Sequence, residues 1–195
     1  MLTIDQIKQL RDETGSAPTQ IKKALEESNG DTEKARELLR IWGKNVSIKK
    51  VSRETKSGLI EAYVHDGKIG VLVEVLTETD FVARNSDFKE FVHSLGLQIA
   101  ATNPKYISKD NIPAEVLEKE KDDLIDQIKD SGKPEEIVKK IVEGKIGSYY
   151  AEVCLLEQPY IKDQDKTIND LLTDLVSKVG EKIVISRFVR YELGS

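Results

Sequence analysis

The 195-residue sequence contains a single cysteine, Cys154, and only two histidines, His65 and His93. One thiol cannot form a disulfide within the chain, and these three side chains are too far apart in sequence to form a local zinc-binding motif. Cys154 lies in an apolar stretch, which favours a small buried side chain over a reactive thiol. These scarcities argue against a disulfide-stabilised protein and against a zinc enzyme.

Long apolar runs are also missing. None approaches the ~20 residues that span a bilayer, and the first ten residues lack the charged and apolar regions of a signal peptide. Neither a phosphate-binding G-x-x-x-x-G-K-[ST] loop nor a G-x-G-x-x-G motif occurs, and the formal net charge of −5 is unlike that of a dedicated nucleic-acid-binding protein. We expect a cytoplasmic protein without a cofactor, a metal or an active site of its own, which contacts neither membrane nor nucleic acid.

Residues 1–43 carry the signals of three short helices. Thr3 and Gln6 form a capping box at the start of the first helix, and Gly15 is placed to end it. The second and third helices show apolar side chains at helical spacing, and Gly43 is expected to close the third. We predict a small three-helix domain that docks on a partner.

Residues 44–57 contain five cations and one acid, Glu54. This composition favours a solvated linker, although a positively charged partner surface is left open. We place the domain boundary in this segment.

A period of two replaces the helical period from Gly58 onward. The alternation of apolar and polar residues ends at Asp66-Gly67, a dipeptide that strongly predicts a β-hairpin. The returning strand, 68–76, is apolar on both faces in its second half, as in a central strand. A helix with one apolar stripe is predicted to follow at 86–101.

Residues 113–147 predict two helices that are interrupted at 131–134. Their dense mixed charge indicates a solvated outer face. Leu117, Leu124 and Ile128 could nevertheless pack on a partner or on a second copy of the chain, so a homodimer is a possible assembly.

The last fifty residues repeat an order found earlier in the chain. Segment 73–82 aligns with 152–161, since an apolar strand leads to an acid and then to an aromatic-aliphatic pair in both. Each segment precedes a helical stripe. The fold class predicted is therefore α+β, with the three-helix domain followed by a core of two related antiparallel α+β subdomains. The boundaries are 58–195 for the core, about 58–108 and 148–195 for the subdomains, and 109–147 for the helical segment that joins them.

The stretch ETDFVARN, residues 78–85, places an aromatic residue directly after a buried strand. From the residues alone, Phe81 packed beneath the next helix is favoured, with Asp80 as a turn or capping residue and Arg84 as a partner of Glu78. An enzyme with Glu78 and Asp80 as acid and base is much less favoured, because no pocket motif or third group accompanies them.

Four segments, in order, resemble the elongation factor Ts family over essentially the full chain. They are LRDETG at 10–15 with KKAL at 22–25 and GD at 30–31, TDFVARN at 79–85, LLEQPYI at 155–161, and the tail from Val179-Gly180-Glu181-Lys182 to Arg190-Tyr191-Glu192-Leu193. The length matches the short form of the family, which lacks a long coiled-coil insertion.

This resemblance implies an N-terminal unit similar to ubiquitin-associated domains, a flexible link and a core of two antiparallel α+β subdomains. It also implies a translation factor that binds elongation factor Tu, in its GDP-bound and nucleotide-free forms, and promotes exchange of GDP for GTP. The alternative is a helical docking module without exchange activity.

The resemblance further implies which residues contact the partner. A loop of four residues enters the partner's GTPase domain near its magnesium site. These residues are Thr79, Asp80, Phe81 and Val82. The resemblance therefore favours an exposed Phe81. Weaker candidates for partner contacts are Leu10, Arg11, Lys22 and Arg84. One segment departs from the family, which usually has a glycine, two methionines and an acid after Thr14-Gly15, whereas this chain has Ser16-Ala17-Pro18-Thr19-Gln20.

Overall fold

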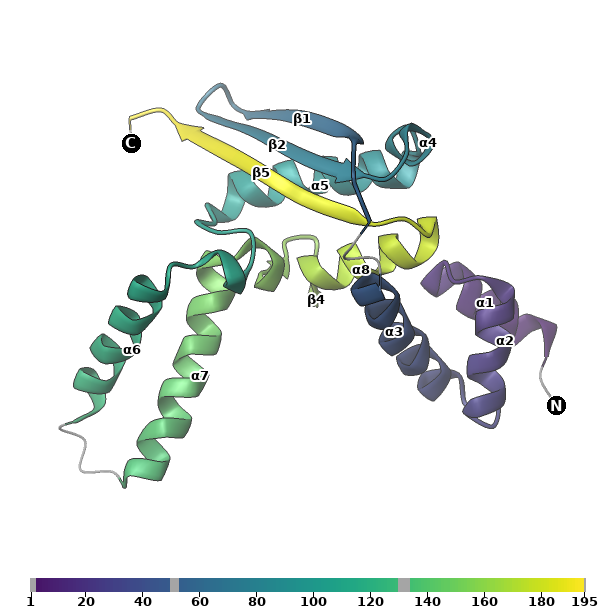
Figure 1. Ribbon diagram of the computed structural model, residues 1–195, viewed down its shortest axis with the longest axis horizontal. Coiled ribbons are helices and arrows are strands. Elements are labelled where there is room, and N and C mark those ends of the chain that lie inside the picture. The colour runs from purple at the N-terminus through teal and green to yellow at the C-terminus, as the bar shows by residue number, and fades with distance from the viewer. Residues whose placement is uncertain (1–2, 50–52, 130–133, 195) are drawn as a thin grey trace. The chain divides into compact units, whose positions relative to one another are not determined.

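The computed structural model describes residues 3–49, 53–129 and 134–194 (Figure 1). Helices and antiparallel sheets make up these residues, which confirms the α+β class. The chain separates into two compact units, Met1–Leu97 with Asp170–Ser195, and Gln98–Asn169. The first unit therefore contains both the beginning and the end of the chain.

The N-terminal helices are α1 (Ile4–Thr14), α2 (Pro18–Glu27) and α3 (Thr32–Lys49). As predicted, Thr3 and Gln6 cap α1 reciprocally, and Gly15 ends it at a φ of 64°. Pro18 occupies the first position of α2, where its missing N–H costs nothing. The apolar stripes of the helices meet in a buried cluster of Leu10, Ile21, Ala24, Leu25, Ala35 and Leu39.

The predicted end of the third helix at Gly43 is wrong, because α3 continues to Lys49. A glycine inside a helix costs only about 1 kcal/mol relative to alanine, and no proline follows it here. The predicted linker 44–57 is therefore shorter than expected. The side chains of 43–50 and the whole of 50–52 lie outside the described residues, and with them three of the five cations of this segment.

The first unit contains a three-stranded antiparallel sheet. Its strands are β1 (Ser57–His65), β2 (Ile69–Thr77) and β5 (Ile183–Glu192), in the order β1-β2-β5. Asp66 and Gly67 both have positive φ, 49° and 66°, as a two-residue type I′ hairpin requires. Strand β2 is thus the central strand that its apolar sequence predicted.

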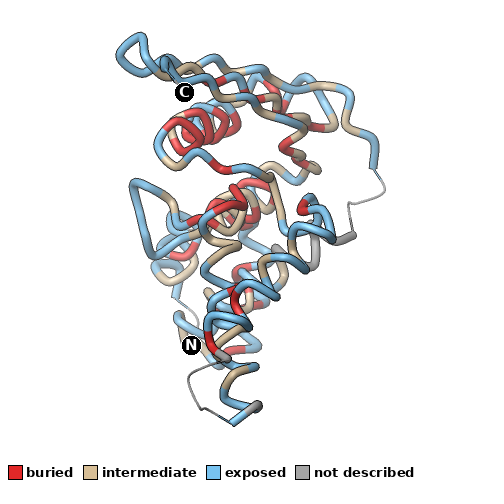
Figure 2. The backbone as a smooth tube through the Cα atoms, turned by 90° about the vertical axis from the view of Figure 1, so that its left-hand side faces the viewer, coloured by how far each residue is buried: buried red, intermediate tan, exposed pale blue. Residues whose placement is uncertain are grey.

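Helix α5 (Ser86–Thr102) packs along one face of this sheet (Figure 1). Val71, Val73 and Val75 are buried on that face. Gly96 brings the helix close to the edge strand, because a Cβ there would lie 3.2 Å from Tyr63 Cβ. Buried residues accordingly concentrate along α5 (Figure 2).

The opposite side of the sheet, called here the outer sheet face, is apolar and exposed. Its large side chains are Ile60, Val64, Leu72, Val189 and Tyr191, which are 61%, 66%, 49%, 38% and 72% exposed. They share one face because Leu72 pairs with Val189, and Gly70 lies between Val64 and Tyr191. Glu74 and Arg187 form an ion pair of 3.1 Å on the same face.

The second unit is largely helical. Its elements are η1 (Lys109–Asn111), α6 (Ala114–Lys129), α7 (Glu135–Val153), η2 (Leu155–Glu157), β3 (Pro159–Tyr160) and β4 (Asp163–Thr167), after which α8 (Ile168–Val179) leads back to the first unit. Helices α6 and α7 form an antiparallel pair (Figure 1). Leu124 and Ile128 are buried, so they pack within the chain rather than on a partner. The predicted break at 131–134 falls mostly outside the described residues.

Two parts of the predicted repeat are wrong. Residues 152–156, expected to form a strand, are the end of α7 and the turn η2, because a short apolar run does not by itself distinguish strand from helix. The final strand, β5, pairs with β2 instead of completing a second subdomain. The strand pairing therefore does not follow the predicted division at 58–108 and 148–195.

Candidate functional site

The candidate site is the one-turn helix α4 (Asp80–Ala83), which follows strand β2. Thr79 is its N-cap and has extended backbone angles, φ −126° and ψ 154°. The Val82 N–H donates to Thr79 Oγ1 at 3.4 Å, so this hydroxyl satisfies a backbone donor that the first turn leaves open.

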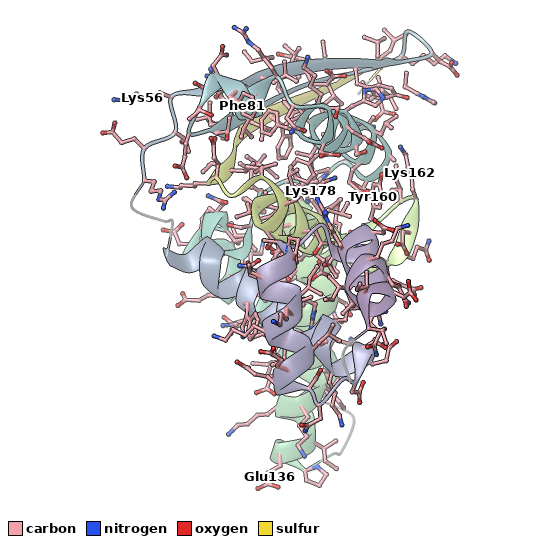
Figure 3. All side chains as sticks on the ribbon, turned by 90° about the vertical axis from the view of Figure 1, so that its right-hand side faces the viewer. Lys56, Phe81, Glu136, Tyr160, Lys162 and Lys178 are labelled. Atoms are coloured by element: carbon pink, nitrogen blue, oxygen red, sulfur yellow. The ribbon has the colours of Figure 1, made fainter. Side chains whose placement is uncertain are left out.

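The side chains of α4 divide sharply between core and solvent. Val82 and Ala83 are 3% and 5% exposed, whereas Phe81 is 83% exposed. Figure 3 shows Phe81 on this turn. The packed position that the residues alone favoured is therefore wrong, and the exposed position that the family resemblance implied is confirmed. Burying a phenylalanine side chain contributes about 1.5–3 kcal/mol, which the free chain leaves available for binding.

A carboxylate from the distant C-terminal segment holds the start of α4. Glu181 Oε2 accepts from the Thr77 hydroxyl and from the Thr79 N–H, each at 2.9 Å. Glu181 Oε1 accepts from the Thr79 hydroxyl at 2.6 Å. The two oxygens of one side chain thus bind both residues that flank Glu78.

Glu78 connects the same two segments, but here the carboxylate belongs to the segment before α4. Its Oε1 accepts from the Lys182 N–H at 2.6 Å, and Arg53 pairs with its carboxylate at 3.1 Å. The predicted pairing of Arg84 with Glu78 is therefore wrong. Arg84 instead pairs with Asp80 at 2.5 Å, across the single turn of α4. Because Asp80 and Arg84 are both exposed, this pair contributes at most about 1 kcal/mol.

A family model for "Elongation factor TS" matches residues 4–195. Three similar proteins named elongation factor Ts come from Acetivibrio thermocellus, Moorella thermoacetica and Caldanaerobacter subterraneus subsp. tengcongensis. They are 52%, 49% and 51% identical over 195 residues, which are 100% of this chain and 91%, 96% and 98% of the relatives. The chain belongs to the elongation factor Ts family. It is thereby a factor of translation elongation.

The remaining candidates for partner contacts differ in exposure. Arg11 and Lys22 are exposed, and Lys22 approaches Glu26 to 3.9 Å. Leu10 is fully buried in the three-helix cluster, so the prediction that it contacts a partner is wrong. Its place on the apolar stripe of α1 explains this, since that stripe faces α2 and α3. Val82 is buried as well and anchors the loop from below.

The residues considered for other chemistry are Cys154 and the pair Glu78 and Asp80. Cys154 is buried, as predicted, and burial raises the pKa of its thiol, so it is uncharged and a poor nucleophile at neutral pH. Glu78 and Asp80 are held by different partners, Lys182 and Arg84. The described residues contain no cluster of three or more His, Cys, Asp or Glu side chains that could hold a metal ion. Within the same residues, no helix is both long and apolar enough to cross a membrane.

Glu181 is the functional candidate that sequence reasoning missed. It lies 102 positions from Thr79, and no local pattern connects the two residues. The tail that contains Glu181 was part of the resemblance to elongation factor Ts, but it suggested no role. The pairing of Thr77 with Ile183 at the end of strands β2 and β5 is what brings them together.

Proposed function

We propose that this chain is the guanine nucleotide exchange factor of elongation factor Tu. It binds the GDP-bound partner, disturbs the magnesium and phosphate site, and dissociates when GTP binds. One observation carries this proposal: in a member of the elongation factor Ts family, an almost fully exposed Phe81 stands on a turn whose neighbouring side chains are buried.

An exchange factor needs no contact with the nucleotide itself. It must bind the nucleotide-free partner more tightly than the loaded partner, and by linkage the nucleotide then weakens the factor's binding by the same ratio. A 10⁴-fold bias corresponds to roughly 5.5 kcal/mol of differential affinity. A buried aromatic anchor at an interface commonly contributes ~2–4 kcal/mol. Phe81 can therefore supply a large part of the bias, and other contacts must supply the rest.

The residues of the loop take separate roles in this proposal. Phe81 inserts into the GTPase domain and displaces the segment that carries magnesium ligands. Asp80 brings a carboxylate close to the same centre, where it disfavours the phosphates by charge. Thr79 caps the turn and Val82 fixes it to the core, so neither needs to touch the partner.

The N-terminal helices provide a second contact in this proposal. Arg11 and Lys22 are exposed on α1 and α2, whereas Leu10, Ile21, Ala24 and Leu25 of these helices are buried in the three-helix core. We place them on the GTPase domain of the partner, beside the contact that Phe81 makes.

We also propose that two copies of the chain associate through the outer sheet face. Exposed apolar patches on a soluble chain commonly mark an interface. Hydrogen bonds from Ser186 and Arg187 lower the pKa of Glu74, so the face carries a carboxylate beside a guanidinium at neutral pH. A two-fold arrangement can set Glu74 of one copy against Arg187 of the other, which makes this face complementary to itself.

Release of fluorescent GDP from elongation factor Tu tests the exchange function. The complex is mixed in a stopped-flow instrument with excess unlabelled GDP and increasing concentrations of the chain. We expect the release rate to rise with chain concentration and to reach a plateau, because release then occurs from a ternary complex. A chain that binds elongation factor Tu in a pull-down but leaves release at its spontaneous rate would establish the docking module instead.

A further inference from the structure

A chain of hydrogen bonds connects the exposed turn to the C-terminal segment. The Val82 N–H donates to Thr79 Oγ1, and the Thr79 hydroxyl donates to Glu181 Oε1. A hydroxyl has one proton and two lone pairs. Because the Thr79 hydroxyl donates its hydrogen bond to Glu181, a lone pair of its oxygen is left to accept from the Val82 N–H. Glu181 thus orients the hydroxyl that caps the turn.

The second oxygen of Glu181 fixes the backbone at the same point. Glu181 Oε2 accepts from the Thr79 N–H at 2.9 Å and also from the Thr77 hydroxyl, whose residue is fully buried. Hydrogen bonds to a charged acceptor are roughly twice as strong as neutral ones. Both the backbone and the side chain of the N-cap of α4 are therefore held by one carboxylate.

The segment before α4 and the C-terminal segment form hydrogen bonds to each other in both directions. Glu181 accepts from the backbone of Thr79, and Glu78 accepts from the backbone of Lys182 at 2.6 Å. The pairing of Thr77 with Ile183 sets the register between them. The direction in which Phe81 leaves the turn thus depends on a tail segment far away in the sequence.

We propose that Glu181 is a positioning residue for nucleotide exchange. It acts through Thr79, whose capped turn presents Phe81 to the partner, and it does not itself need to touch elongation factor Tu. This inference rests on the proposed exchange function.

The test compares Glu181→Ala, Glu181→Gln and the control Glu192→Gln in the GDP-release assay. Glu192 is another ion-paired carboxylate, at the far end of the same C-terminal segment. We expect Glu181→Ala to lower the plateau rate of release about tenfold. Glu181→Gln keeps an oxygen for the Thr79 N–H but offers an amide to the hydroxyl, so its rate should lie in between. Glu192→Gln should behave as the wild type.

A second background separates positioning from general damage to the fold. Phe81→Leu keeps a smaller apolar side chain, so we expect it to keep a measurable rate. If Glu181 acts through the placement of Phe81, Glu181→Ala should lower the rate by less than about twofold in this background, since residues in one network are not additive. An equal factor in both backgrounds, or no effect of Glu181→Ala on the wild type, would overturn the inference.

Amide hydrogen exchange of the free chain, followed by NMR, tests the same inference without the partner. Glu181→Ala should accelerate exchange at the Val82 amide at least about tenfold and leave the Val73 amide of strand β2 protected. Unchanged protection at Val82 would contradict the inference. A wild-type chain that releases no GDP would refute the proposed function alone, because the Val82 measurement would still decide whether Glu181 holds the turn.

Discussion

Phe81, Val82 and Ala83 are consecutive residues, yet only the first is exposed. A helical turn rotates successive side chains by about 100°, so anchoring two of them in the core fixes the third on the outside. The anchored pair also makes the turn rigid, and a rigid aromatic side chain loses little entropy when it binds. The core beneath the turn thus keeps the phenylalanine exposed, as the proposed contact with a partner requires.

Gly58 is a residue at which the sheet below this turn allows no side chain. It lies at the start of β1, and a Cβ there would stand 2.3 Å from the Val75 carbonyl oxygen. We expect Gly58→Ala to lower the free energy of unfolding by about 1–3 kcal/mol, because the strand must move to make room. For a chain of this size each kcal/mol shifts the Tm by about 2–4 °C. Circular dichroism during heating measures the shift.

Gly70 offers a matched control in the neighbouring strand. No heavy atom outside its own chain neighbours lies within 4 Å of a Cβ at this position. Gly70→Ala should therefore leave the Tm unchanged or raise it slightly, since alanine restricts the unfolded chain. Equal Tm values for the two variants would show that the close approach at Gly58 is relieved without cost.

At the scale of elements, sequence signals predicted the helix caps and turns that depend on only a few neighbouring residues. The capping box at Thr3 and the Asp66-Gly67 turn each act within a few residues, and each is present as predicted. The ends of α3 and α7 were missed. In both helices the chain continues through residues that only weakly favour a stop, and tertiary contacts decide such cases.

Strand β1 shows a further limit of sequence patterns. The alternation of its side chains was evident, but the period does not reveal which face is buried. In the structure Ile60 and Val64 are exposed, whereas Glu61 and Tyr63 are partly buried on the side of α5. Glu61 is satisfied there by His93 at 2.8 Å. A polar residue that finds a partner can thus occupy the covered face and leave apolar residues outside.

The same contrast between local signals and long-range contacts applies to the candidate site. The exposed position of Phe81 was available only from the family resemblance, because an aromatic residue after a strand packs inward more often than not. The roles of Glu181 and Glu78 depend on the pairing of β2 with β5, which joins parts of the sequence more than 100 positions apart. Such long-range pairing has no signature in a single sequence.

At the scale of the whole molecule, the outer sheet face predicts the assembly state. We expect a mass near twice the 21.9 kDa of one chain in sedimentation equilibrium at about 10 µM or above. Leu72→Glu should shift the mass towards one chain, since it places a charge at the centre of the apolar face. Ile137→Glu, on the exposed side of α7, is the control and should keep the wild-type mass. A wild-type mass of one chain would refute self-association through this face.

In the proposed function, exchange is also a property of the whole molecule, because the N-terminal helices, the sheet and the turn α4 would all have to be in place when the partner binds. The central claim is that Phe81 carries the largest single part of it. The most direct measurement is the plateau rate of GDP release from elongation factor Tu with the wild type, Phe81→Ala and the control Ile137→Ala. We predict that Phe81→Ala, with a Tm like that of the wild type, lowers the plateau rate by about 30-fold or more, as expected for loss of an interface anchor, while Ile137→Ala does not change it. A folded Phe81→Ala chain that releases GDP as fast as the wild type would contradict this account.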